Sequence, residues 1–176
     1  HPNLIVFDGG DSFQGSWPIN ASQGMGSVAA FSLLGVDVAS VGNHEFDYGP
    51  RTDGEGDPLR GALMRAAEAA SFQWVATNVV SADGQPWTPP GIAHTTLISQ
   101  QGVDIGVIGL STVDTPQTTL TRNVADLTFL DPVPVVGEAA AALRQRGAEV
   151  VVVVGHLTGK CEPPDYISAP PADCDP

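Results

Sequence analysis

Short apolar stretches alternate along this chain with stretches of helical character. The apolar stretches are rich in valine and isoleucine and end at glycine or polar residues, which is typical of strands in a protein core. Strands are therefore predicted at residues 3–8, 37–41, 73–77, 92–99, 103–110 and 148–156. Helices are predicted at residues 22–35, 57–71 and 138–147. Strands and helices that alternate in this way predict an α/β fold.

Several local features refine this prediction. Gly102 separates two adjacent strands, so these strands are expected to form an antiparallel hairpin. The last strand contains the uninterrupted run Val150–Val154 and is expected to be buried on both faces. Asp57 and Pro58 suit the N-cap and the first position of the second helix. Residues 111–131 show no periodicity and are expected to be irregular.

The composition narrows the possible partners of the chain. Its 176 residues are enough for one domain with a sizeable core. Seven lysine and arginine residues stand against 20 aspartate and glutamate residues, a formal net charge of -13. This balance argues against a broad basic surface for a nucleic-acid polymer or an anionic membrane. A small anionic substrate is compatible with it, because bound cations invert the local field of an acidic pocket. No apolar run approaches the length of a membrane span, and no pattern indicates an oligomeric state.

Two cysteines, Cys161 and Cys174, lie near the end of the chain. The segment 161–176 is rich in proline, has no periodicity and is expected to be a loop or linker. Two cysteines in one short loop suggest a disulfide, and hence an extracellular, periplasmic or cell-surface location. The alternative is a pair of unpaired thiols or half of a metal site.

Polar side chains follow three of the predicted strands. Asp11 follows the first strand, Asn43 and His44 follow the second, and His156 ends the last one. In open α/β sheets the ligand site lies outside the carboxyl ends of the strands, so parallel neighbouring strands would bring these residues together. Carboxylate, amide and imidazole donors together suit a divalent ion such as Zn, Mn, Fe, Co or Mg, without singling one out.

The same residues belong to three sequence motifs. "GGDSFQGS", "GNHEFDYG" and a strand ending in "GH" occur in this order. Together they resemble the calcineurin-like metallophosphoesterases, and most of all the branch of 5'-nucleotidases and 2',3'-cyclic-nucleotide phosphodiesterases. The resemblance implies a sandwich of mixed β-sheets flanked by helices. It also implies a hydrolase with two metal ions, in which a metal-activated water removes phosphate from a nucleotide or another small phosphoester.

The resemblance also implies a role for individual residues. Asp11 would bridge the two metal ions, and Asn43 and His156 would be ligands of one of them. His44 would lie over the phosphate and stabilise or protonate the leaving side. Asp47 would hold His44 in the right tautomer and orientation, which agrees with the need of a catalytic histidine for a partner on its other nitrogen.

Two motifs of the family are missing. Neither an Asp-x-His motif before the first strand nor a Gly-His-x-His motif after His156 occurs. We therefore interpret residues 1–160 as part of a metallophosphoesterase catalytic domain, incomplete at both ends, and expect the C-terminal substrate domain to be absent. One metal would keep three ligands, and the other only the bridging Asp11. The alternative is a non-catalytic fragment or binding module that retains the fold and at most one metal.

Each motif residue also has a simpler explanation. Asp11 and Asn43 would be turn residues, and His44 would be a surface residue. Asp47 would cap a turn, and His156 would occupy a packed core position. Asp8 and Glu45 are expected to be turn or supporting groups rather than ligands. The joint occurrence of the motifs favours the functional interpretation.

Overall fold

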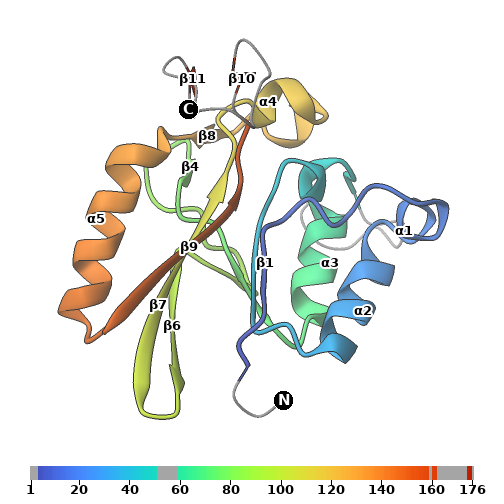
Figure 1. The fold of residues 1–176 in the computed structure, drawn as a ribbon. Coiled ribbons are helices and arrows are strands. Elements are labelled where there is room, and N and C mark those ends of the chain that lie inside the picture. The colour runs from blue at the N-terminus through green and yellow to red at the C-terminus, as the bar shows by residue number, and fades with distance from the viewer. Residues whose placement is uncertain (1–3, 51–58, 159, 162–173, 176) are drawn as a thin grey trace.

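The computed structural model describes residues 4–50, 59–158, 160–161 and 174–175, the last four by their backbone alone. Two β-sheets pack face to face, and helices cover the outer face of each sheet (Figure 1). Val38 and Val75 of one sheet meet Val107 of the other in the layer between the sheets. The predicted α/β sandwich of mixed sheets flanked by helices is confirmed.

The first sheet contains four parallel strands in the order β1-β2-β3-β5. They are β1 (Phe7–Asp8), β2 (Val38–Ser40), β3 (Gln73–Val75) and β5 (Ile92–Ala93). Helices α1 (Trp17–Ala21), α2 (Met25–Leu34) and α3 (Gly61–Ala69) lie on its outer side (Figure 1). The larger core is built here, and Phe13 and Trp74 meet edge to face in it with ring centroids 6.0 Å apart.

The second sheet is mixed and has the order β6-β7-β9. It contains β6 (Thr95–Gln100), β7 (Val103–Ser111) and β9 (Val150–His156). β6 runs antiparallel to β7, and β9 runs parallel to it. Helix α5 (Pro132–Gln145) packs on the outer face of this sheet, where Leu143 lies directly over Gly106.

Smaller elements complete the described part of the chain. They are the antiparallel pair β4 (Val79–Ser81) and β8 (Leu127–Phe129), helix α4 (Thr115–Thr118), and the 3-10 helices η1 (His44–Phe46) and η2 (Thr121–Asn123). β10 (Lys160–Cys161) and β11 (Cys174–Asp175) pair antiparallel, with Cys161 opposite Cys174 in the backbone register. The side chains of Cys161 and Cys174 are not among those that the structure describes, so the predicted disulfide stays a prediction. No helix among the described residues is long and apolar enough to cross a bilayer.

The predicted hairpin is confirmed. β6 and β7 are joined by Gln101 and Gly102, which both have positive φ, 53° and 83°. Two consecutive residues with positive φ are the signature of a tight turn whose twist matches that of the flanking strands.

Four predictions are corrected. β9 is not buried on both faces: it pairs only with β7 among the described residues, and Val150 and Val153 are 43% and 45% exposed. The helix predicted at 22–35 begins only at Met25, after the separate α1. α5 begins earlier than predicted, because Pro132 fits the first turn and the Asp131 carboxylate caps it. The stretch 111–131 contains α4, η2 and β8 instead of irregular chain alone. The expected N-cap, Asp57, lies outside the described residues.

The contact between α5 and the second sheet provides a test of the core. Leu143 is fully buried, so Leu143→Ala removes its side chain from the interior and is expected to lower the free energy of unfolding by about 2–5 kcal/mol. Leu33, which is 89% exposed on α2, gives a matched control, because Leu33→Ala is expected to change the value by less than about 0.5 kcal/mol. Urea denaturation measures both. Equal effects of the two substitutions would contradict this packing.

Candidate functional site

The predicted site residues meet where strands of both sheets end. Asp11 follows β1, Asn43 and His44 follow β2, and His156 is the last residue of β9. β1 and β2 are parallel neighbours, but β9 belongs to the other sheet. His156 Nε2 nevertheless lies 3.0 Å from Asp11 Oδ2. The expected convergence therefore occurs across the two sheets and not along the edge of one.

Hydrogen bonds between the sheets hold these strand ends together. The Ser40 hydroxyl, at the end of β2, donates to the Leu110 carbonyl of β7 at 3.1 Å. The Ser111 hydroxyl, at the end of β7, donates to the Val41 carbonyl. Because Ser111 is the register partner of His156, these two bonds bring the end of β9 beside the loops that follow β1 and β2.

The loops after β1 and β2 approach each other too closely for side chains. Gly10 has φ 98°, and a Cβ on it would lie 2.7 Å from the Gly42 nitrogen. A Cβ on Gly42 would lie 2.5 Å from Asp11 Oδ1. Asp11 itself has φ 70°, a left-handed conformation that is rare outside glycine, asparagine and aspartate. The backbone here is therefore shaped to hold the Asp11 carboxylate in one place.

The buried carboxylate of Glu45 joins these two loops. Its side chain accepts N–H groups from Asp11 at 2.8 Å, Ser12 at 2.6 Å and Gly42 at 2.7 Å, and the Ser12 hydroxyl at 3.0 Å. Burial raises the pKa of Glu45 to about 7, and the N–H groups that point at it limit the rise. Glu45 thus acts as the supporting group that the sequence suggested, and the four hydrogen bonds that it accepts become visible only in the structure.

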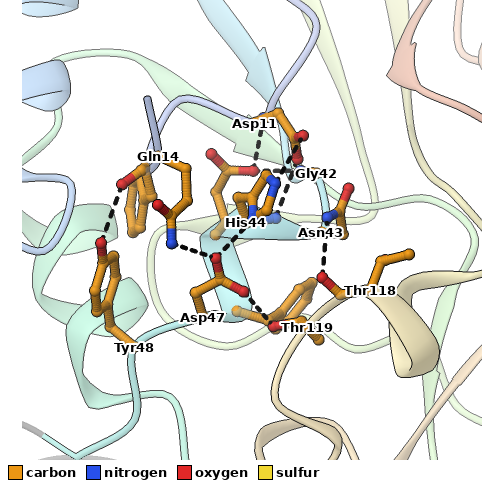
Figure 2. Close-up of polar contacts among 12 residues, drawn as sticks. Asp11, Gln14, Gly42, Asn43, His44, Asp47, Tyr48, Thr118 and Thr119 are labelled. Carbon is orange, nitrogen blue, oxygen red and sulfur yellow. Dashed lines mark hydrogen bonds and ion pairs between the residues drawn. The ribbon is translucent and has the colours of Figure 1, made fainter. Parts of the chain in front are cut away.

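His44 is held from two sides (Figure 2). Its backbone N–H donates to Asp11 Oδ1 at 3.0 Å, and its ring Nδ1 lies 2.6 Å from Asp47 Oδ2. An ionised carboxylate only accepts hydrogen bonds, so Nδ1 carries the proton in this contact. The other ring nitrogen, Nε2, lies 3.8 Å from Asp11 Oδ2 and faces the Asp11–His156 pair.

The Asp47 carboxylate has two further partners that the sequence reasoning missed. Gln14 Nε2 donates to Oδ2 at 2.7 Å, and Thr119 Oγ1 donates to Oδ1 at 2.7 Å. Gln14 lies inside the "GGDSFQGS" motif, which was a usable signal. Thr119 lies in the stretch without periodicity, and nothing in the sequence around it indicated a contact with Asp47.

Asn43 is buried, and its side chain contacts the segment that carries Thr118. The residue is 4% exposed, and its Nδ2 atom makes a long contact of 3.5 Å with the Thr118 carbonyl. Figure 2 shows the amide nitrogen directed toward Thr118 and the amide oxygen on the other side. The oxygen, which is the donor atom that a metal would use, is therefore not engaged by Thr118.

The side chains at this site supply a limited set of donors for a divalent ion. Among the described residues, no group of three or more His, Cys, Asp or Glu side chains is placed to hold a metal. Asp11 and His156 form a carboxylate–imidazole pair, and an amide oxygen from Asn43 would be the third donor. Donors of these kinds are ones that a borderline divalent ion accepts, and the described residues supply no ligand set for a second ion.

A second polar chain supports the turn that carries Asp47. The Asn123 side chain donates to the Phe46 carbonyl at 2.8 Å, and the Asn123 carbonyl accepts from Arg60 at 2.8 Å. Arg60 is buried, and its guanidinium forms a two-pronged ion pair with Asp126 at 2.7 and 2.9 Å. This ion pair lowers the pKa of Asp126.

Comparisons with known proteins find relatives over most of this chain. No protein-family model matches it. The chain is 27% identical over 164 residues to Endonuclease YhcR of Bacillus subtilis, 28% over 157 residues to the 5'-nucleotidase of Diplobatis ommata, and 28% over 138 residues to Cell wall protein Lmo0130 of Listeria monocytogenes. The matches cover 90%, 88% and 74% of this chain but only 13%, 25% and 18% of those proteins.

A solved structure shows the same similarity in three dimensions. The 5'-nucleotidase precursor of Thermus thermophilus superposes with a TM-score of 0.74 at 30% identity. The match covers 88% of this chain and 28% of that protein. The similarity thus includes nearly all of this chain and about a quarter of its nucleotidase relatives.

The Glu45 contacts predict a large effect of one small substitution. All four partners of Glu45 donate, so Glu45→Gln turns an NH2 group toward donors inside the protein and is expected to lower the free energy of unfolding by about 1–3 kcal/mol. Glu138→Gln, at an exposed position on α5, is the matched control and is expected to have little effect. Urea denaturation at about pH 8.5, where Glu45 is ionised although its pKa is raised to about 7, compares the two. Equal stability of the wild type and Glu45→Gln would contradict the proposed loop contact.

The Arg60–Asp126 pair predicts a pH dependence. Because the pKa of Asp126 is lowered in the folded state, its ionisation stabilises the fold above the ordinary value of 3.8. This contribution is lost as the pH falls through the lowered pKa. Asp126→Asn is therefore expected to be less stable than the wild type at neutral pH and to lose less stability on acidification. Thermal unfolding across pH 2–7 measures both curves, and parallel curves would contradict the assignment.

Proposed function

Since this chain is a distant homologue of the 5'-nucleotidases and calcineurin-like phosphoesterases, we propose that it forms part of a metal-dependent hydrolase that removes phosphate from nucleotides. The chain spans about a quarter of its nucleotidase relatives, so the activity of a whole protein belongs to this proposal as well. The contact of His44 with Asp47, with the free ring nitrogen facing Asp11 and His156, is the observation that carries it.

In the proposed site, Asp11, Asn43 and His156 hold a divalent ion. Such an ion, when bound, lowers the pKa of a water molecule and neutralises charge on the phosphoryl oxygens. Asp11 suits this role because the backbone around Gly10 and Gly42 fixes its carboxylate. His156 contributes an imidazole from the other sheet, 3.0 Å from that carboxylate.

His44 acts on the leaving group in the proposed reaction. In its neutral form the ring proton is on Nδ1 and points at Asp47, so Nε2 is the nitrogen that exchanges a proton with the substrate. When the ring becomes an imidazolium, Nε2–H can protonate the departing oxygen, and the Asp47 carboxylate 2.6 Å from Nδ1 stabilises the positive charge. This division of roles is typical of a general acid with an orienting carboxylate.

A second candidate is a binding module without catalysis. It is favoured by the lack, among the described residues, of any group of three His, Cys, Asp or Glu side chains suited to a metal. In that case the fold would keep at most one ion, and His44 would have no reaction to assist. The two candidates differ in one measurable property, which is hydrolysis that depends on His44.

The proposed substrate is a small phosphoester, and the proposed location is outside the cytoplasm. The net charge of -13 disfavours the binding of a long polyanion such as a nucleic acid. It is compatible with a small anionic ligand that is bound through a cation. One relative is named a cell wall protein, and Cys161 faces Cys174 in the backbone register, which supports a disulfide in an oxidising compartment.

The hydrolysis of AMP and of a 2',3'-cyclic nucleotide with added Mn²⁺ or Zn²⁺ tests the proposal. We expect His44→Ala to lower kcat by roughly 10²–10⁴-fold, the usual size of a general acid–base contribution. His94→Ala is the matched control, because His94 follows β5 and its carbonyl accepts a hydrogen bond from Thr77, away from this site. We expect it to keep the wild-type rate.

Two outcomes would contradict the proposal, one for hydrolysis itself and one for the role of His44. A wild-type chain that releases no phosphate with either metal favours the binding module, and an unchanged rate in His44→Ala removes the role given to His44. Elemental analysis of the purified chain and of Asp11→Asn then asks whether one ion is bound. No ion in the wild type would remove the single-metal site as well.

A further inference from the structure

The Asp47 carboxylate receives hydrogen bonds from three different parts of the chain. We propose that Gln14 and Thr119 are positioning residues, which hold Asp47 so that His44 presents its Nε2 atom to the substrate. This inference rests on the proposed function and adds two residues to it. Neither residue reaches the substrate in this scheme, since both act through Asp47.

The chemistry of the three contacts leaves only one arrangement of hydrogen atoms. Gln14 Nε2 and His44 Nδ1 lie 2.7 and 2.6 Å from Asp47 Oδ2, and Thr119 Oγ1 lies 2.7 Å from Oδ1. A carboxylate can only accept, so the amide must contact it with its NH2 group and the threonine with its hydroxyl hydrogen. Hydrogen bonds of this length to an ionised acceptor belong to the stronger class in proteins.

Bonds on both oxygen atoms prevent the carboxylate from rotating. Gln14 comes from the loop after β1, and Thr119 follows α4, so the two groups grip Asp47 from separate elements. Thr119 is itself fixed, because its backbone N–H donates to the Thr115 carbonyl at 3.1 Å. Without Thr119, Oδ1 loses its partner and the carboxylate can turn its oxygens away from His44.

The position of Asp47 decides which nitrogen of His44 carries the proton. A free neutral imidazole side chain prefers its hydrogen on Nε2, and in that form Nδ1 has no hydrogen to donate to Asp47. The contact with Asp47 reverses this preference and places the hydrogen on Nδ1. Gln14 and Thr119 contact Asp47 and not the His44 ring, so they influence the tautomer of His44 through Asp47 (Figure 2).

The tautomer can be measured on the chain itself. Long-range ¹H–¹⁵N spectra of the histidine rings distinguish Nδ1–H from Nε2–H, and we expect neutral His44 in the wild type to be the Nδ1–H form. In the double variant Gln14→Met/Thr119→Val, which removes both donors while keeping the side-chain sizes, we expect a mixture dominated by Nε2–H. Thr119→Ser, which keeps the hydroxyl, is expected to retain the wild-type tautomer.

Thr121→Val is the matched control for the loss of a hydroxyl. Thr121 lies two residues further on, and its hydroxyl donates to the Pro116 carbonyl rather than to Asp47. We expect it to leave the His44 tautomer unchanged. A wild-type tautomer in the double variant, with the fold intact by circular dichroism, would overturn the proposal. A loss of the tautomer in Thr121→Val would overturn it too, because the effect would then not be specific to Asp47.

This experiment separates the positioning role from the proposed function. If the wild type hydrolyses no phosphoester but the tautomer shifts as expected, the proposed function fails and the positioning by Gln14 and Thr119 stands. If hydrolysis is present, the double variant is expected to lose roughly ten-fold in kcat with KM unchanged, a part of the usual general acid–base contribution. An unchanged kcat together with a shifted tautomer would show that the tautomer of His44 does not affect catalysis. It would overturn the proposal that Gln14 and Thr119 support the reaction.

Discussion

The buried carboxylate of Glu45 is the contact on which the site depends. It accepts backbone N–H groups from both loops that carry site residues, those of Asp11 and Ser12 on one side and Gly42 on the other. Without these bonds, the N–H groups of a left-handed Asp11 and of a crowded Gly42 would be buried without acceptors. A cost of this kind explains why an acid occupies a position with no exposure to solvent, although burial raises its pKa to about 7.

A continuous polar network extends from this centre through the first sheet's loops. It leads from Asp11 through His44 to Asp47, and the turn that carries Asp47 is bonded in turn to Asn123. The network ends at the buried guanidinium of Arg60, whose charge is compensated by Asp126. Polar groups in an interior stabilise a single arrangement only when each has its partners, and the described members of this network have them.

The second sheet adds a residue to the site but is less enclosed than the first. His156 reaches Asp11 because Ser40 and Ser111 link the ends of the two sheets. β9, which carries His156, has half-exposed valines and one hydrogen-bonded neighbour among the described residues. The resulting carboxylate–imidazole pair is compatible with a hydrolase and with a binding module. The behaviour of His44 distinguishes them, because only the hydrolase needs an oriented imidazole.

Much of this protein was determined by its sequence. The spacing of hydrophobic residues and the residue types in each segment are local properties of the sequence. The alternation of strands and helices, the hairpin at Gly102 and the α/β class could therefore be predicted. The motifs pointed to Asp11, Asn43, His44, Asp47 and His156. Contacts join four of these residues at the strand ends, whereas Asn43 contacts Thr118. Their roles as ligands and acid–base groups stay predictions.

The tertiary structure alone decided how these residues are held. Hydrophobicity could not show that β9 has a single hydrogen-bonded neighbour among the described strands, since a valine run is equally suited to a half-exposed strand. Gln14 and Thr119 come from places 105 residues apart in the chain, and only folding brings both to Asp47. Contacts between distant segments leave no periodic trace in the sequence, because each partner is an ordinary polar residue until the fold places an acceptor beside it.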